Sequence, residues 1–285
     1  MSPRLLVIFA VTAALLHAAA PIDDAVALYK SKQYPEARAA FQQIAITEPA
    51  NAAVHYYLGV LAEKRGDTEE AVKQLETATT LAPKNFTYFL ELGGAYGTAI
   101  DKAGMFSKLG IAKQCGAALE RAVALAPDSI DARNGLISFY RSAPSFAGGS
   151  MSKAYEQAAE IKKLDPIVGA YAYGQLYLAD KKYDDAFNVL ETALKTAPDN
   201  YLALYSIGRT AAQTGLRLDR GEQALRRCLD LTPAKNEPGY AAVHWRLGVI
   251  AEKRHDPAAA RAAYQASLQL DPEFKLAADS LAKLK

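Results

Sequence analysis

Apolar residues recur along most of this chain at the spacing of amphipathic helices, and part of the pattern is repeated almost unchanged. The segment AAVH at 52–55 recurs at 241–244, and GVLAEKRGD at 59–67 recurs as GVIAEKRHD at 248–256. The offset is 189 residues in both segments. A match of this length predicts further copies of the same helical unit between the two.

Prolines mark the ends of these copies. The prolines that each follow an apolar helical stretch are Pro49, Pro83, Pro127, Pro166, Pro198, Pro233 and Pro272. They are separated by 34, 44, 39, 32, 35 and 39 residues. Proline ends a helix because its ring clashes with a continuing turn, so each proline predicts the close of one unit.

Small residues recur inside the units at positions where two helices would cross. Glycines follow three of the prolines by ten residues, at Gly59, Gly93 and Gly208, and Gly174 and Gly248 are displaced from this spacing by length changes. A second small residue precedes each closing proline by twelve residues, as Ala71 and Ala260 do. This pattern predicts two antiparallel helices per unit that approach closely, with larger apolar residues filling the space between units.

In these respects the chain resembles the tetratricopeptide-repeat family, whose period is about 34 residues. The resemblance implies an all-α fold: a right-handed superhelical solenoid of about seven helix-turn-helix units plus a C-terminal capping helix. The expected units are 21–51, 52–85, 86–129, 130–166, 167–200, 201–235 and 236–274, with the capping helix at 275–285.

Two units depart from the family's length. The third carries an extra segment, 97–113, whose apolar residues keep a near-helical spacing and predict lengthened helices. The fourth carries an insertion at 142–150, where a proline and paired glycines predict a loop. This loop could take part in binding or could be a plain connection.

Residues 1–20 have the order of a secretory signal peptide: one early positive charge, an apolar run, then small residues. We therefore expect a periplasmic or secreted protein, cut after Ala19 or Ala20 and not inserted in the membrane. The alternative is an uncleaved segment that tethers the chain to the inner membrane.

The net charge of the chain bears on the class of partner. The formal charge is only +2, without basic runs, so no nucleic-acid partner is expected.

The two cysteines, Cys115 and Cys228, fall in different units, and distant units of a solenoid do not touch. We expect two buried thiols and no disulfide between them.

No motif of a catalytic, metal or cofactor site is present, so the expectation is no enzyme, no metal and no cofactor. His55 and His244 occupy the same position in two units, which favours a structural role for both. His255 falls where Gly66 stands in the matching copy, in the turn between two helices, and is expected to be exposed.

In the family that the chain resembles, first helices line the concave face of the superhelix. The candidate partner-binding residues on that face are Tyr56, Asn134, Arg141, Tyr171, Tyr205, Arg209, Trp245 and Arg246. Aromatic and arginine side chains of this kind suit a protein or peptide segment. For Tyr171 and Tyr205, packing between units is an equal alternative. The predicted function is an exported adaptor, and the alternative is a membrane-tethered structural assembly factor of an envelope complex.

Overall fold

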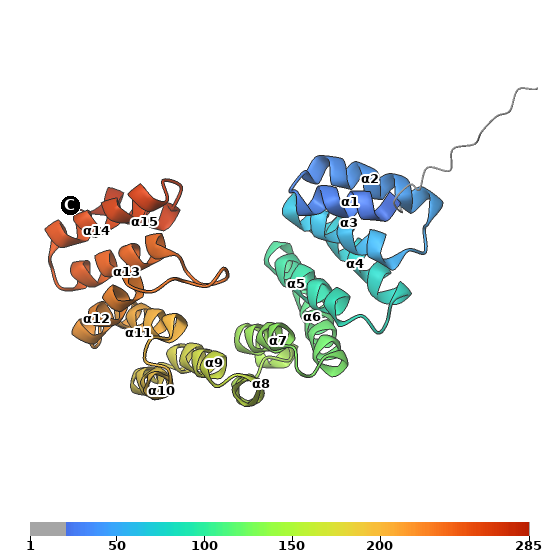
Figure 1. Cartoon of the computed structure of the whole chain (residues 1–285). Coiled ribbons are helices and arrows are strands. Elements are labelled where there is room, and N and C mark those ends of the chain that lie inside the picture. Colours follow the sequence, from blue (N-terminus) through green and yellow to red (C-terminus); the bar gives the residue numbers. More distant parts are fainter. Residues whose placement is uncertain (1–20, 285) are drawn as a thin grey trace, which may run out of the picture. The chain divides into compact units, whose positions relative to one another are not determined.

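The computed structural model describes residues 21–284, and the expected signal peptide, 1–20, lies outside this range. The described residues form helices and connecting turns without a strand. Figure 1 shows the helices in chain order, most of them in antiparallel pairs. The helices are α1 (Pro21–Lys30), α2 (Tyr34–Thr47), α3 (Ala52–Lys64), α4 (Thr68–Leu81), α5 (Phe86–Lys102), α6 (Met105–Leu125), α7 (Ile130–Ser142), α8 (Met151–Leu164), α9 (Pro166–Ala179), α10 (Tyr183–Thr196), α11 (Tyr201–Thr214), α12 (Leu218–Leu229), α13 (Tyr240–Lys253), α14 (Pro257–Leu270) and α15 (Lys275–Lys283).

The all-α fold class predicted from the sequence is confirmed. Odd-numbered helices from α1 to α13 are the first helices of the repeats, and even-numbered helices are the second helices. The chain divides into two compact units, Met1–Ala99 and Ile100–Lys285, here called the N-terminal and C-terminal units. In the C-terminal unit, α11 packs against α9 and α13, so first helices of successive repeats are neighbours.

Short polar residues start many of these helices. The side chains of Asn51, Asp67, Ser129 and Asn200 each accept a hydrogen bond from a backbone N–H in the first turn of the following helix. Several turns between paired helices place one residue in the left-handed region, and Gly66, between α3 and α4, has φ 76°. His255 takes the same place with φ 60° and is exposed, as the sequence predicted.

The predicted close crossing of paired helices is confirmed by the glycines of the first helices. A Cβ built on Gly59 would lie 2.6 Å from Leu75 Cγ, and one on Gly248 would lie 2.3 Å from Tyr264 Cε1. Carbon atoms never approach this closely, so these two sites require glycine in the present packing. Gly174 has more room, because the same construction leaves 3.6 Å to Leu190.

Both length departures have the form that the sequence predicted. The extra residues of the third repeat extend α5 to 17 residues and α6 to 21. The insertion of the fourth repeat is a loop with one short 3₁₀ turn, η1 (Ser145–Ala147), followed by Gly148 at φ 102°. The loop is tied back to α7 by the Ser150 N–H, which donates to the Tyr140 carbonyl.

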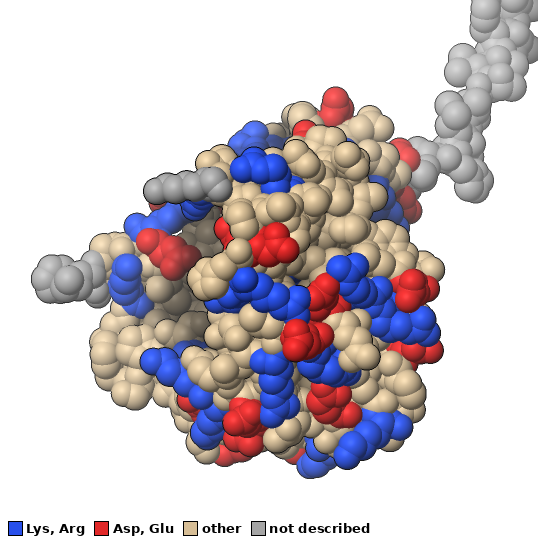
Figure 2. Space-filling view, turned by 90° about the vertical axis from the view of Figure 1, so that its left-hand side faces the viewer, with Lys and Arg blue, Asp and Glu red and all other residues tan. Residues whose placement is uncertain are grey.

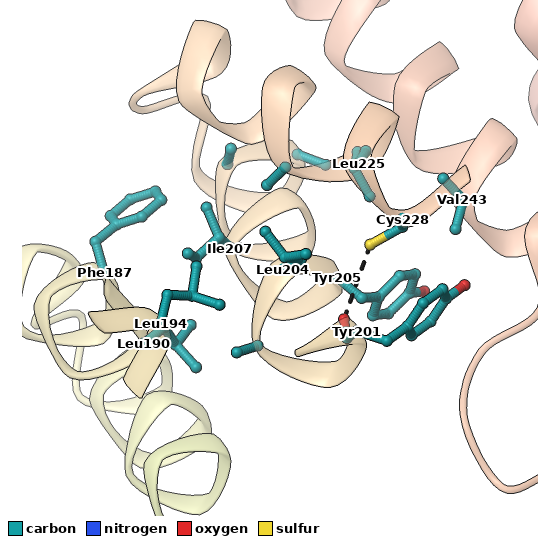
Figure 3. Close-up of a cluster of buried hydrophobic side chains, with 14 of the residues drawn as sticks. Phe187, Leu190, Leu194, Tyr201, Leu204, Tyr205, Ile207, Leu225, Cys228 and Val243 are labelled. Atoms are coloured by element: carbon teal, nitrogen blue, oxygen red, sulfur yellow. Dashed lines mark hydrogen bonds between the residues drawn. The ribbon is translucent and has the colours of Figure 1, made fainter. Parts of the chain in front are cut away.

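A continuous apolar core runs through the C-terminal unit from α10 to α13. Figure 3 shows its labelled side chains, with the rings of Tyr201 and Tyr205 stacked beside each other. Cys228 belongs to this core, and its thiol points at the Tyr201 carbonyl oxygen, 3.8 Å away. Cys115 and Cys228 are both buried, as the sequence predicted.

Candidate functional site

The structure brings five of the eight predicted site residues into one connected group. These residues, called here the arginine array, are Tyr171, Tyr205, Arg209, Trp245 and Arg246. They come from the first helices α9, α11 and α13 of the C-terminal unit. The shared origin follows from the repeat, because equivalent positions of successive first helices face the same side.

One aromatic position of the repeat contacts the next first helix, or the capping helix, in three of the units. The ring of Tyr56 stacks on that of Tyr88 in α5, with centroids 4.8 Å apart. Tyr171, in α9, accepts a hydrogen bond from Arg209 in α11. The last member, Trp245, reaches the capping helix α15. The position therefore joins successive repeats as well as presenting a ring.

Arg209 is the centre of the array. Its Nη1 donates to the Tyr171 hydroxyl at 3.3 Å, and both side chains are half-buried. The Arg209 Nε is buried and has no hydrogen-bond partner. A buried N–H without a partner is uncommon, because it loses its bond to water and gains none in return.

Tyr205 is a support of the array and not a surface residue. Only 6% of it is exposed, and it packs in the core between α11 and α13. Its hydroxyl accepts a hydrogen bond from the Arg246 guanidinium. Tyr205 therefore packs between repeats, which is the second of the two roles that the sequence allowed. It is not an accessible partner-binding residue, and that prediction is corrected. Tyr171, half-buried, keeps part of its ring accessible.

Trp245 is held by residues near the C-terminus of the chain. Its Nε1 donates to the Ser280 hydroxyl at 3.1 Å, and its ring meets Phe274 edge to face with centroids 6.0 Å apart. The Arg246 guanidinium carbon lies 4.2 Å from the centroid of the Trp245 ring. Cation–π stacking thus fixes Arg246, and the contacts to α15 fix Trp245.

The charged guanidinium group of Arg246 is largely shielded from solvent. Burial lowers the pKa of Arg246, the hydrogen bond to Tyr205 opposes this, and the nearby charge of Arg209 lowers it further. Guanidinium nevertheless stays protonated in proteins. Like Arg209, Arg246 has a buried Nε with no partner. Neither arginine forms an ion pair with a carboxylate among residues 21–284.

Other arginines of the C-terminal unit are placed differently. Arg220 binds both carboxylate oxygens of Glu191, at 2.8 and 3.1 Å. Arg254, at the end of α13, pairs with Glu222 and Asp219 of α12. Figure 2 shows basic and acidic side chains interspersed over the face that it draws. Arg220 and Arg254 thus have carboxylate partners, which Arg209 and Arg246 lack among the described residues.

The other three predicted residues are not members of the array. Asn134 and Arg141 are exposed on α7. Nearby, Phe146 of the insertion loop is 73% exposed, a feature that the sequence did not single out. Tyr56 belongs to the N-terminal unit, where burial and the Glu91 carboxylate raise its pKa.

Two carboxylates of the N-terminal unit were missed by sequence reasoning. Burial, followed by the charge of Glu91, raises the pKa of Glu63 to about 7. Burial also raises the pKa of Glu91, against the effect of Lys64. Glu63 follows Tyr56 by seven residues, which places both on one helix face, and that spacing could have identified it.

The structural role predicted for His55 fits its contacts. Its ring nitrogens bond with the Gln74 side chain at 2.6 Å and the Pro49 carbonyl at 2.8 Å. Arg133, at the same distance from its own proline, bonds with the Pro127 carbonyl and Gln157.

No group of three His, Cys, Asp or Glu side chains within the described range could hold a metal ion. None of the described helices is both long and apolar enough to cross a membrane.

The paired helices and the joined first-helix layers define an α-helical repeat protein. Family models described as tetratricopeptide repeat match residues 22–96 and 171–235, and 241–274. The chain belongs to the tetratricopeptide-repeat family, which generally provides non-enzymatic scaffolds for protein interactions. A comparison with curated protein sequences finds no match.

Several solved structures share the fold at low sequence identity. A tetratricopeptide-repeat protein from Parabacteroides merdae superimposes with TM-score 0.65 at 14% identity, covering 92% of this chain and 96% of that one. PilW, described as a type IV pilus biogenesis factor, gives TM-score 0.51 at 17% identity, covering 81% of this chain and 98% of PilW. Human IFIT1 gives TM-score 0.58 at 18% identity, covering 93% and 62%. These likenesses concern the fold alone.

Proposed function

We propose that this protein is an exported adaptor that holds a protein or peptide segment against the first helices of its C-terminal unit. The observation that carries the proposal is the arginine array: two arginines without carboxylate partners beside the accessible part of Tyr171. Fixed aromatic and arginine side chains are the residues that dominate the binding energy of protein interfaces.

The remainder of the chain supports a binding role. Its near-neutral charge of +2 offers no general attraction for nucleic acid. Arg220 and Glu191, on the second helices α12 and α10, are paired with each other, whereas Arg209 and Arg246 have no carboxylate partner among the described residues.

Export is part of the proposal and rests on residues 1–20, with their apolar run and small-residue block. Mass spectrometry of the protein from its own organism tests this point. A mature N-terminus at Ala20 or Pro21 supports an exported adaptor. An intact Met1 in the membrane fraction would instead support the tethered assembly factor.

Affinity capture with paired variants tests the binding surface. The purified chain and its Tyr171→Ala and Tyr183→Ala variants are used as bait with envelope and secreted proteins of the source organism. Tyr183 is also half-buried but begins the second helix α10, so it controls for loss of a tyrosine. Capture that is lost with Tyr171→Ala and retained with Tyr183→Ala supports the proposal. Equal capture by all three would place binding elsewhere.

A further inference from the structure

The same hydrogen-bonded arrangement occurs in two of the repeats, six residues after a proline. In the second repeat, the His55 ring bonds with the Pro49 carbonyl at 2.8 Å and with the Gln74 side chain of α4 at 2.6 Å. In the fourth repeat, Arg133 takes the place of the histidine, and it bonds with the carbonyl of its own proline and with Gln157 of α8. In both repeats, a carboxamide of the second helix thus satisfies a polar side chain of the first helix.

The seventh repeat has a histidine at the same position, His244, but lacks the glutamine. At the offset of 189 residues, the place of Gln74 is taken by Ala263, whose methyl group cannot form a hydrogen bond. The equivalent proline carbonyl, that of Pro238, accepts a hydrogen bond from the Tyr201 hydroxyl at 2.6 Å. Neither ring nitrogen of His244 has a hydrogen-bond partner among residues 21–284, and neither is closed off from solvent.

A groove lies beside His244, lined by residues of α12, α13 and α14. Its volume of about 510 Å³ is within the ~300–1,000 Å³ typical of ligand pockets. One face of α14 contributes a row of alanines: Ala259, Ala262, Ala263 and Ala266. The second repeat has longer side chains at all four equivalent places: Glu70, Lys73, Gln74 and Thr77. The helix face that these side chains cover in the second repeat is therefore bare in the seventh.

The charges that line this groove already have partners. Glu222 pairs with Arg226 at 2.7 Å and also with Arg254. Asp256 accepts a hydrogen bond from a backbone N–H in the first turn of α14. Burial and the charge of Arg226 lower the pKa of His244, so its imidazole is neutral at pH 7 and presents one donor and one acceptor. A neutral group that both donates and accepts suits this ring better than a carboxylate or an ammonium group does.

We propose that this groove binds a segment of a partner protein through the side-chain carboxamide of a glutamine or asparagine, which bonds with His244. A carboxamide carries both a donor and an acceptor, and the chain itself uses this group at the same position in two other repeats. The alanines of α14, with Leu247 and Ile250 of α13, provide apolar surface for the stem of that side chain. The residues of the arginine array do not line the groove, so this inference goes beyond the proposed function and does not depend on it.

Nuclear magnetic resonance of the imidazole nitrogens tests the site in the purified full chain. The probes are acetyl-glutamine methylamide, acetyl-glutamate methylamide and acetyl-methionine methylamide, which share their backbone amides and differ at the end of the side chain. We expect the glutamine probe to shift the His244 signals saturably, and the other two to bind with about fivefold lower affinity, the effect of one neutral hydrogen bond. His55, already bonded with Gln74, and His255, exposed in a turn, are controls in the same spectrum and should not respond.

Two substitutions in α14 form a matched pair. Ala263→Gln restores the residue of the second repeat, so it should give His244 the signals of a hydrogen-bonded ring and abolish the response to the glutamine probe. Ala258→Gln makes the same change at an exposed position of α14 outside the groove and should respond as wild type does. Circular dichroism at 222 nm verifies that both variants are folded. If Ala263→Gln does not fold, the comparison of the three probes on the wild-type chain decides.

Three results would overturn the site: no shift of His244 with the glutamine probe, an equal affinity for the glutamate or methionine probe, or an unchanged response in Ala263→Gln. The reciprocal variant Gln74→Ala tests the comparison between repeats. It should change the His55 signals to those of a ring that lacks its carboxamide partner. Unchanged His55 signals would show that the glutamine does not hold the ring, and the inference for His244 would fail with it.

Discussion

Trp245 of the last repeat donates its indole N–H to Ser280 of the capping helix, at 3.1 Å. This bond joins the arginine array to the end of the chain, because the same indole ring carries the guanidinium of Arg246. The capping helix therefore has two roles. It covers the last repeat, as solenoid ends require, and it positions a residue of the candidate site.

Removal of the indole should loosen the cap. Trp245→Ala is expected to lower the free energy of unfolding by about 2–3 kcal/mol, below the cost at a fully buried site because Trp245 is half-buried. Ser280→Ala, which removes only the hydroxyl acceptor, should cost about 1 kcal/mol. Hydrogen exchange of α15 measures both effects. Unchanged protection of α15 in Trp245→Ala would show that the cap is held by other contacts.

Much of the fold could be predicted because each repeat imposes the same local demands. The helix pairs, the glycines of the crossings and the exposed turn at His255 all follow from residues of a single unit. The candidate site was harder to predict. Tyr171 and Tyr205 hold the same position in successive repeats, yet only Tyr205 is buried, owing to the core that α12 and α13 build around it. Burial of this kind depends on neighbours that one unit's sequence does not specify.

The crossings provide a matched pair of glycine substitutions. Gly248→Ala places a Cβ against the Tyr264 ring, which is fully buried and cannot move aside, and we expect a loss of ~1–3 kcal/mol in stability. Gly174→Ala has ordinary van der Waals room beside Leu190 and should stabilise by ~0.5–1 kcal/mol, because alanine favours helix. Thermal denaturation followed by circular dichroism compares them. Equal effects of the two changes would contradict the assigned crossings.

The cysteines should be unreactive while the protein is folded. Burial raises the pKa of Cys115 to about 11 and that of Cys228 to about 12, so few thiolates exist at pH 8. With Ellman's reagent we expect no rapid reaction in buffer and two thiols per chain in guanidinium chloride. A fast reacting thiol in buffer would show that one of the two sites opens readily.

Glu63 should make stability depend on pH in the direction opposite to an ordinary paired carboxylate. Its folded pKa of about 7 is above the reference value of 4.5, because burial and the Glu91 charge disfavour ionisation. Between these values the unfolded chain releases the proton while the folded chain retains it. Stability from this group is therefore complete below pH 4.5, falls as the pH rises to about 7, and changes no further above that.

The size of this effect follows from the shift after a reduction for solvent screening, since Glu63 is only half-buried. One pKa unit corresponds to ~1.4 kcal/mol, and we expect a loss on the order of 1 kcal/mol across the range. Glu63→Gln should remove this contribution and raise the melting temperature at pH 8. Glu69→Gln makes the same charge change at an exposed position of α4 and should keep the wild-type slope. If Glu63→Gln and Glu69→Gln show the same melting temperatures from pH 4.5 to 8, then Glu63 does not hold its proton in the folded chain.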